Sequence, residues 1–210
     1  MTGAENDQLD DPIADAILGG STYEQLRVLR YAQFKQRIPQ KLAWQTVILL
    51  SVASLALAAA FFPPSVARMM PAGDAFAMSP KILLLGVFAV GVELLTGAGL
   101  VGVALARLHL EPSISERQAS TLLDLEDVAS LLGLVTGGAA AVVTVAGFLL
   151  GLGGAPAIRA YGGLDVGRNP YAPSEFDVTV VEVAVVALAG AVVLFLASRY
   201  LERRLQRLRT

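Results

Sequence analysis

The chain has 210 residues, of which 55% are hydrophobic and only 16% are charged, and its mean hydropathy is +0.61. Soluble domains carry about 25% charged residues, so this composition and the long uncharged runs exclude a soluble globular protein and indicate a polytopic membrane protein. The formal net charge of −2 argues against a general nucleic-acid-binding protein. Arginine far outnumbers lysine, and the apolar runs are rich in Ala, Val and Gly, which is typical of a GC-rich prokaryotic genome.

Cysteine is absent, which excludes disulfides, thiol catalysis and Cys-ligated metals within this chain. The single histidine, His109, cannot form a bis-His haem site or a histidine-cluster metal site. No base stands beside a serine or threonine in a nucleophile pattern. The acids of the middle loop could chelate a cation, although Asp124 to Asp127 are better explained as caps of the third span, and no other metal-ligand spacing is evident. These acids are Glu116, Asp124, Glu126 and Asp127. We therefore expect neither an enzyme nor a protein with a metal or another cofactor.

Residues 1–41 predict two short helices before the membrane domain. Asp11 and Pro12 can begin the first helix, and residues 21–24 (Ser-Thr-Tyr-Glu) fit a capping box for the second. Pro39 is expected to end the second helix. The second helix is basic and weakly amphipathic, which suits a helix lying at the lipid headgroups; a docking surface for a cytoplasmic partner is the alternative.

Four apolar segments are each long enough to cross a hydrocarbon core of about 30 Å, which takes roughly 20 helical residues. Some forty mostly polar residues precede the first segment, so we expect it to be a retained anchor and not a signal peptide. The predicted fold is all-α, a compact bundle of four transmembrane helices within residues 42–198. The predicted spans are residues 42–62, 82–106, 128–152 and 178–198.

The basic residues predict the orientation. If the four segments span, twelve of the sixteen Lys and Arg residues lie on the side of the two termini and the middle loop. Basic residues favour the cytoplasm, so we expect a multi-pass protein of the cell membrane with both termini cytoplasmic. Within the middle loop, Asp124 and Asp127 are expected to cap the third span. The opposite loop at 153–177, rich in Gly, Pro and Tyr, is expected to be either an ordered lid or a connector.

The third span carries a stripe of small and hydroxyl residues on one helical face of about 100°. Small residues allow helices to approach closely in lipid, so this stripe predicts a helix-packing seam. The spacing does not decide between packing within the chain and dimerisation. Its members are Gly133, Thr136, Gly137, Ala140, Thr144, Gly147 and Gly151.

The second span carries a related stripe that includes Gly86 and Gly97 and surrounds an acid, Glu93. Glu93 is expected about 17 Å from the outer edge, near the middle of the membrane. An ionisable residue at that depth indicates a functional site, while a neutral glutamic acid bonded to a neighbouring helix would be structural. Thr136 and Thr144 are the candidate hydrogen-bond partners.

Glu182 is expected only about five residues into the fourth span, where water reaches a carboxylate. Its ordinary interpretation is an interfacial residue. In the functional interpretation, Glu93 binds and releases a proton or cation in a pocket open to the outside, and Glu182 and Asp177 form its acidic mouth.

The tail, residues 199–210, continues the fourth helix with a strongly basic surface. Each basic residue near an anionic leaflet contributes about 1 kcal/mol, so the tail predicts a lipid-binding anchor rather than a nucleic-acid-binding segment. The tail arginines are Arg199, Arg203, Arg204, Arg207 and Arg209.

Two functions are compatible with these features. The leading one is a non-enzymatic, multi-pass structural or interacting subunit of a membrane assembly, with the lipid bilayer and either a second copy or another membrane protein as partners. The alternative is a small proton- or cation-coupled transporter or channel-like subunit that uses Glu93. Neither interpretation includes nucleic acid as a partner.

Overall fold

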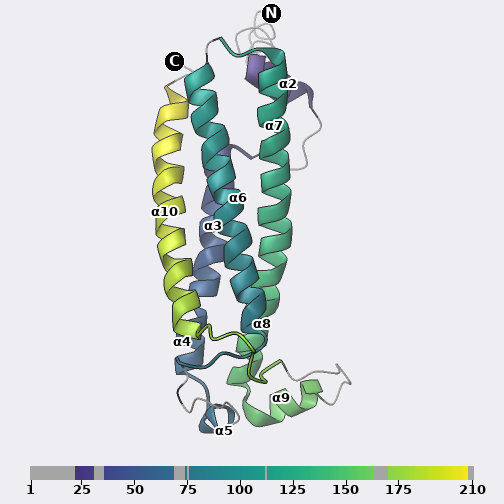
Figure 1. Ribbon diagram of the computed structural model, residues 1–210, viewed down its shortest axis with the longest axis vertical. Helices are drawn as coiled ribbons and strands as arrows, with labels where there is room; N and C mark the ends of the chain where they lie inside the picture. Colours follow the sequence, from purple (N-terminus) through teal and green to yellow (C-terminus); the bar gives the residue numbers. More distant parts are fainter. Residues whose placement is uncertain are drawn as a thin grey trace, which may run out of the picture.

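The computed structural model describes residues 22–30, 36–68, 74, 76–111, 113–162 and 170–207. In these ranges the elements are helical, apart from one isolated antiparallel β-bridge between Pro80 and Pro173. Four helical segments are long and apolar enough to cross a membrane (Figure 1). They are Ile38–Ala60, Leu83–Leu110, Glu116–Leu152 and Val180–Gln206.

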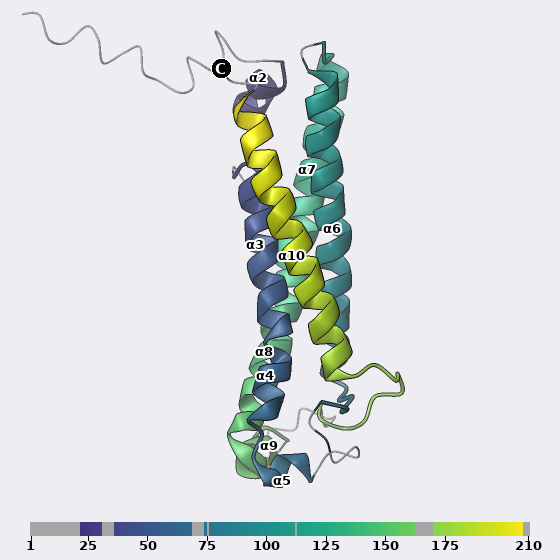
Figure 2. The ribbon, with the colours of Figure 1, turned by 90° about the vertical axis from the view of Figure 1, so that its left-hand side faces the viewer.

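The four segments run side by side as one elongated bundle (Figures 1 and 2). Helix α2 (Thr22–Leu29) and the last turns of α10 (Val180–Gln206) lie at one end, called here the α2 end. The short helices α5 (Pro64–Ala67) and α9 (Gly154–Gly162) lie at the opposite end, called here the α9 end. The predicted all-α fold of four long apolar helices is therefore confirmed.

The first long segment differs from the predicted span 42–62 at its beginning. Helix α3 (Ile38–Ala53) already begins at Ile38, and Pro39 lies in its first turn instead of ending an earlier helix. Proline is tolerated there because the first helical N–H groups have no intrahelical acceptor. A short break at Ser54 separates α3 from α4 (Leu55–Ala60).

The third long segment is much longer than the predicted span 128–152. Helix α7 (Glu116–Leu131) begins at a capping box in which Ser115 Oγ accepts from the Gln118 N–H. It continues through a π-helical turn, η1 (Leu132–Gly137), into α8 (Gly138–Leu152). Asp124 and Asp127 therefore lie inside a continuous helix and do not cap its beginning. The middle loop shrinks to the few residues between α6 (Leu83–Leu110) and α7.

Helix α2 packs against α7, and its Tyr23 side chain is fully buried. A helix free to lie at the headgroups would keep such a residue at the lipid surface, so this part of the N-terminal region belongs to the bundle end. The predicted first helix at Asp11, with residues 12–21, lies outside the described residues.

The connections at the α9 end are ordered where they are described. The chain after Phe76 and the chain after Pro170 pair backbone to backbone: Lys81 N–H donates to Ala172 O at 2.9 Å, and Ser174 N–H donates to Ser79 O at 2.8 Å. Tyr171 is buried, and its hydroxyl donates to the Gly147 carbonyl. This part of the predicted 153–177 loop is therefore a lid on the bundle and not a loose connector.

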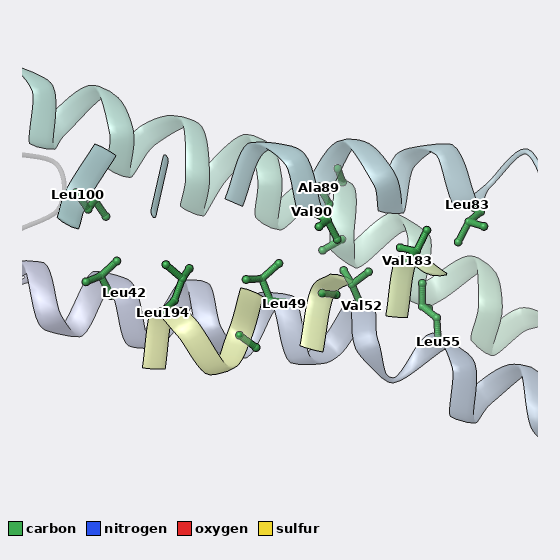
Figure 3. Close-up of a cluster of buried hydrophobic side chains, with 14 of the residues drawn as sticks. Leu42, Leu49, Val52, Leu55, Leu83, Ala89, Val90, Leu100, Val183 and Leu194 are labelled. Carbon is green, nitrogen blue, oxygen red and sulfur yellow. The ribbon is translucent and has the colours of Figure 1, made fainter. Parts of the chain in front are cut away.

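The apolar core runs along the bundle axis. Figure 3 shows buried side chains of α3, α4, α6 and α10 facing one another, from Leu42 and Leu100 to Leu55 and Leu83. The most extensive helix pairing joins α3 and α10. Most outward-facing residues of the long helices are apolar, Trp44, Leu95 and Val193 among them, which suits lipid contact.

Candidate functional site

Glu93 lies inside the bundle, ten residues after the beginning of α6, and its exposed fraction is 0%. Two glycines of the third segment make room for its carboxyl group. A Cβ atom on Gly137 would lie 2.6 Å from Glu93 Oε1, and one on Gly133 would lie 3.4 Å from Glu93 Oε2. The two glycines therefore form a notch that holds the carboxyl group.

The notch coincides with the π-helical turn of the third segment. Gly133 and Gly137 both belong to η1, which interrupts the α-helical hydrogen bonding between α7 and α8. Single π-helical turns inside α-helices are frequent at functional sites. The irregular turn thus faces the one carboxyl group buried at this level.

Two polar side chains accompany Glu93. Gln45 Nε2 donates to Thr96 Oγ1 at 2.8 Å, and the Thr96 hydroxyl donates to the Val92 carbonyl at 2.7 Å. Gln45 Nε2 and Glu93 Oε2 both border the Gly133 notch, which places the amide beside the acid.

Three oxygens of this group have no hydrogen-bond partner among the described residues: both carboxyl oxygens of Glu93 and Oε1 of Gln45. An unpaired buried polar atom costs about 1–3 kcal/mol, and an unpaired buried charge costs far more. The Gln45 amide of α3 lies beside this carboxyl group, and no hydrogen bond of standard geometry joins the two side chains.

The predicted partners of Glu93 lie elsewhere. Thr136 is exposed on the outside of η1. Thr144 is buried, but its hydroxyl donates to the Ala140 carbonyl at 2.8 Å and its methyl group packs against Gly86. The structure brings Gln45 and Thr96 to Glu93 instead.

The predicted packing seam is used within the chain. A Cβ atom on each of its glycines would meet a side chain of another element at about 3 Å or less, so these glycines allow close approach inside one bundle. Ala140 is buried in the same interface. Outside the Glu93 notch, the contacts are Gly86 with Thr144, Gly97 with Leu194, Gly147 with Ile82 and Gly151 with Phe62.

Glu182 serves as a helix cap. Its Oε2 accepts from the Thr179 N–H at 2.8 Å, and its own N–H donates to Thr179 Oγ1 at 3.3 Å. It is exposed at the α9 end, and a Cβ atom on Gly190 would touch Leu94, the neighbour of Glu93. Glu182 therefore lies eight residues, about 12 Å along the helix axis, from the level of Glu93. The structure does not join Glu182 to the Glu93 site.

A second buried polar group, missed from the sequence, lies nearer the α2 end. Lys41 Nζ donates to Glu126 Oε1 at 2.7 Å, and the Tyr23 hydroxyl donates to Glu126 Oε2 at 2.5 Å. Ser130 Oγ donates to the Glu126 carbonyl at 2.5 Å, and the exposed fraction of all four residues is 2% or less. Burial, and then the adjacent carboxylate, hold the pKa of the Tyr23 phenol well above its usual value. One sequence signal was available: Lys41 and Gln45 stand four residues apart, on one helical face.

Arg107 covers this group at the surface. Its guanidinium lies 4.2 Å from the centroid of the Tyr23 ring and donates to Glu24 at 2.7 Å and to Glu111 at 3.1 Å. Arg107 is therefore a buried, paired residue that fixes α2 to α6, and not simply a basic residue of a loop. His109, nearby on α6, is exposed.

The arginines of the tail are largely exposed on the last turns of α10. Arg199 forms an exposed ion pair with Glu202 at 3.4 Å and lies over the Phe195 ring, while Arg204 lies over the Tyr200 ring. Arg203 and Arg207 are exposed, and Arg209 lies outside the described residues. The exposed, basic surface is compatible with the predicted lipid anchor. Lipid binding itself stays a prediction.

Within the described ranges, no group of three or more His, Cys, Asp or Glu residues is placed to hold a metal ion. The chain matches no protein-family model, no curated protein and no solved structure. The structure therefore defines a class of protein: the described chain is helical, and four of its helices are compatible with a multi-pass membrane protein. Its candidate functional site is the group around Glu93.

Proposed function

We propose that the protein spans the membrane four times and that Glu93 binds and releases a proton in a proton- or cation-coupled transport process. The observation that supports this is the burial of both Glu93 carboxyl oxygens without a partner in the described chain. A structural acid would be bonded to a neighbouring helix. An unpartnered acid deep among apolar helices is the arrangement from which proton-binding sites are built.

In this proposal Glu93 is a neutral carboxylic acid in the state that the structure describes. An unpaired carboxylate is strongly disfavoured in such surroundings, because desolvation penalises the charged form. Release of the proton requires water or a cation to approach the carboxyl group. The π-helical turn is the element best placed to admit them, since it forms the wall of the notch.

The test measures proton flux into liposomes that contain the purified protein, under an imposed membrane potential. Glu93→Gln keeps the shape of the side chain and cannot exchange a carboxyl proton, so we expect it to abolish the flux while its unfolding profile stays near that of the unmodified protein. Glu182→Gln is the matched control, because it changes an exposed acid at the α9 end. Equal flux through both variants would reject the proposal, and collapse of Glu93→Gln alone would make Glu93 structural.

A second readout concerns the acid itself. Dicyclohexylcarbodiimide, an apolar reagent, modifies protonated carboxyl groups in apolar surroundings, and mass spectrometry of peptides locates the modification. We expect Glu93 to be modified at neutral pH and Glu182 to be spared. An unmodified Glu93 would mean that the residue carries no accessible proton.

The second candidate function is a non-enzymatic subunit of a membrane assembly, in the cell membrane with the α2 end cytoplasmic. One observation favours it: α2 lies outside the four long segments and exposes the apolar residues Val28 and Leu29, the latter to 72%. Extraction of the tagged protein in mild detergent, followed by native mass spectrometry, distinguishes the two. A stoichiometric foreign partner supports the subunit function, and a homo-oligomer or monomer alone favours an autonomous membrane unit.

A further inference from the structure

The buried polar side chains are unevenly distributed about Glu93. In the described part of the chain, Lys41, Gln45 and Thr46 of α3 lie on the side of Glu93 that faces the α2 end. So do further residues of the other three long segments, which are Thr96, Arg107, Glu126, Ser130 and Ser198. Among the described residues on the other side, Thr144 and Tyr171 are buried, and the hydroxyl group of each donates to a backbone carbonyl of α8.

These side chains form a column along the bundle toward Glu93, called here the polar column. Beneath Arg107 it begins with Tyr23, Lys41 and Glu126, whose side chains are joined by hydrogen bonds, and with Ser130, whose hydroxyl donates to the Glu126 backbone carbonyl. It continues with Gln45 and Thr96, which are also bonded to each other, and ends at Glu93. Its two groups are separated by one helical turn, from Lys41 to Gln45 on α3, which is about 6 Å along the axis.

Among the residues that the structure describes, the opposite half of the core offers no such series of polar groups. Apolar side chains of every long segment fill it, among them Leu49, Leu55, Leu83, Phe148 and Val183. The lid closes its end, where the backbones before α6 and before α10 pair and Tyr171 bonds to α8. An apolar, close-packed region of this kind does not conduct protons.

We infer that protons reach and leave Glu93 from the α2 end, through the polar column, while the α9 half of the core is closed. This inference rests on the proposed function, in which Glu93 exchanges a proton. It replaces the sequence-based expectation of a pocket open at Glu182 and Asp177, both of which are exposed at the α9 end.

In the closed state described here, a proton from water at the α2 end protonates the Glu93 carboxylate and forms an O–H bond; on release in this state that bond breaks and the proton returns to the same side. Net flux across the membrane then requires a second state in which the α9 half opens to Glu93. The groups that face the entrance are Tyr23 of α2, Lys41 of α3, Arg107 of α6, Glu126 of α7 and Ser198 of α10. The Lys41–Glu126 pair is the charged step between the surface and the Gln45–Thr96 group.

The experiment uses the full chain in liposomes whose two sides are set to different pH values. A Gln206→Cys reporter in this cysteine-free chain gives the orientation, because an impermeant thiol reagent reaches the α2 end from one side only. Dicyclohexylcarbodiimide reaches the bundle from the lipid and not from either aqueous side, so a change in the modification of Glu93 when the pH changes on one side reports the protonation of Glu93. The pH is raised on one side at a time.

We expect modification of Glu93 to fall when the pH rises at the α2 end and to stay constant when it rises at the α9 end. Dependence on the α9 side would overturn the inference while leaving the proposed function intact. If Glu93 is not modified at any pH, the proposed function fails and the inference fails with it.

Two variants locate the route. Glu126→Gln removes the buried carboxylate from the column, and Ser130→Ala is a milder change that folds more readily. A positioned proton-transfer group contributes at least about 100-fold in rate, so we expect the response of Glu93 to the α2 side to slow by about that factor in Glu126→Gln and by less in Ser130→Ala. Thr144→Val, in the closed half, is the matched control and should respond at the original rate. An unchanged rate in both column variants would overturn the route.

Discussion

Between Glu93 and the α2 end, the four long segments bury a lysine, the acid Glu126, the amide of Gln45 and the hydroxyl groups of Thr96 and Ser130 among their leucines. Between Glu93 and the α9 end, they bury leucine, valine, alanine and phenylalanine, with Thr144 bonded inside its own helix. Both halves pack closely, so the difference does not lie in packing. The two halves differ in how much stability is lost when a contacting side chain moves away. This loss is large for a buried charge and small for a buried methyl group.

The helices are held in register mainly in the half between Glu93 and the α2 end, called here the polar half; the other half is called the apolar half. In the apolar half, glycines and large side chains fit by shape, and small shifts remain tolerable. In the polar half, Lys41, Tyr23 and Glu126 join three helices through bonds of defined length and direction.

The largest loss in the free energy of unfolding is expected from Lys41→Met in the polar half. The substitution leaves Glu126 as a buried carboxylate without its cation, and breaking a buried pair on one side costs about 3–5 kcal/mol. The free energy of unfolding in detergent measures it. Arg30→Ala is the control, because the Arg30–Asp124 pair is exposed and such pairs contribute about 0–1 kcal/mol. If both variants lowered the free energy of unfolding equally, the buried Lys41–Glu126 pair would contribute no more than an exposed ion pair.

Gly137→Ala tests the boundary between the halves. Its Cβ atom would lie 2.6 Å from Glu93 Oε1, so the carboxyl group must shift, and overpacking of this kind costs about 1–3 kcal/mol. Gly91→Ala is the matched control, since nothing lies within 4 Å of a Cβ atom there. The double variant Gly137→Ala, Glu93→Ala should lose less free energy of unfolding than the two single variants lose together. Strict additivity would show that the glycine does not serve the carboxyl group.

The smallest effect is expected at the lid of the apolar half. Tyr171→Phe removes the hydrogen bond to the Gly147 carbonyl, which contributes about 0.5–1.5 kcal/mol to the free energy of unfolding. Burial, and next the neighbouring Tyr161, raise the pKa of Tyr171 to about 12. Because the folded protein holds this proton more tightly, its contribution is complete below about pH 10, the ordinary value for tyrosine, and is lost as the pH rises through 12.

An ultraviolet titration of the unmodified protein minus Tyr171→Phe isolates this phenol. We expect a single ionisation near pH 12. An ionisation near pH 10 would mean that the lid opens and exposes Tyr171 to water.

The sequence predicted the four long helices, because each carries about twenty apolar residues in a row. It also predicted the inward direction of Glu93, because its neighbours on the helical wheel are small. It also placed Gly133 and Gly137 in one close-packed seam. It did not predict the partners of Glu93, since Gln45 comes from a helix whose rotation about its own axis is set only by packing. Thr136 was assigned to the inner face on the assumption of a uniform α-helix, and it lies in the π-helical turn, where that assumption fails.

The polar half was hidden for a different reason. Glu126 stands among Asp124 and Asp127 in a segment that reads as a solvated loop, and only the continuation of α7 turns it inward toward Lys41. Helix propensity alone gave no signal for this extension, because the contacts with α2 and α6 that stabilise α7 join residues far apart in the sequence.

The wide turn η1 has a consequence for the length of the chain itself. A π-helical turn holds one residue more than an α-helical turn, so deleting a single residue between Leu132 and Gly137 would allow the third segment to close into a regular helix. A π-helical turn completes about the same rotation as an α-helical turn with one residue fewer, so α7 and α8 would keep their faces toward Lys41 and toward the lid. The spacing of Gly133 and Gly137 would change, and with it the notch that holds the Glu93 carboxyl group. The extra residue of this stretch therefore serves the notch and not the orientation of the two helices.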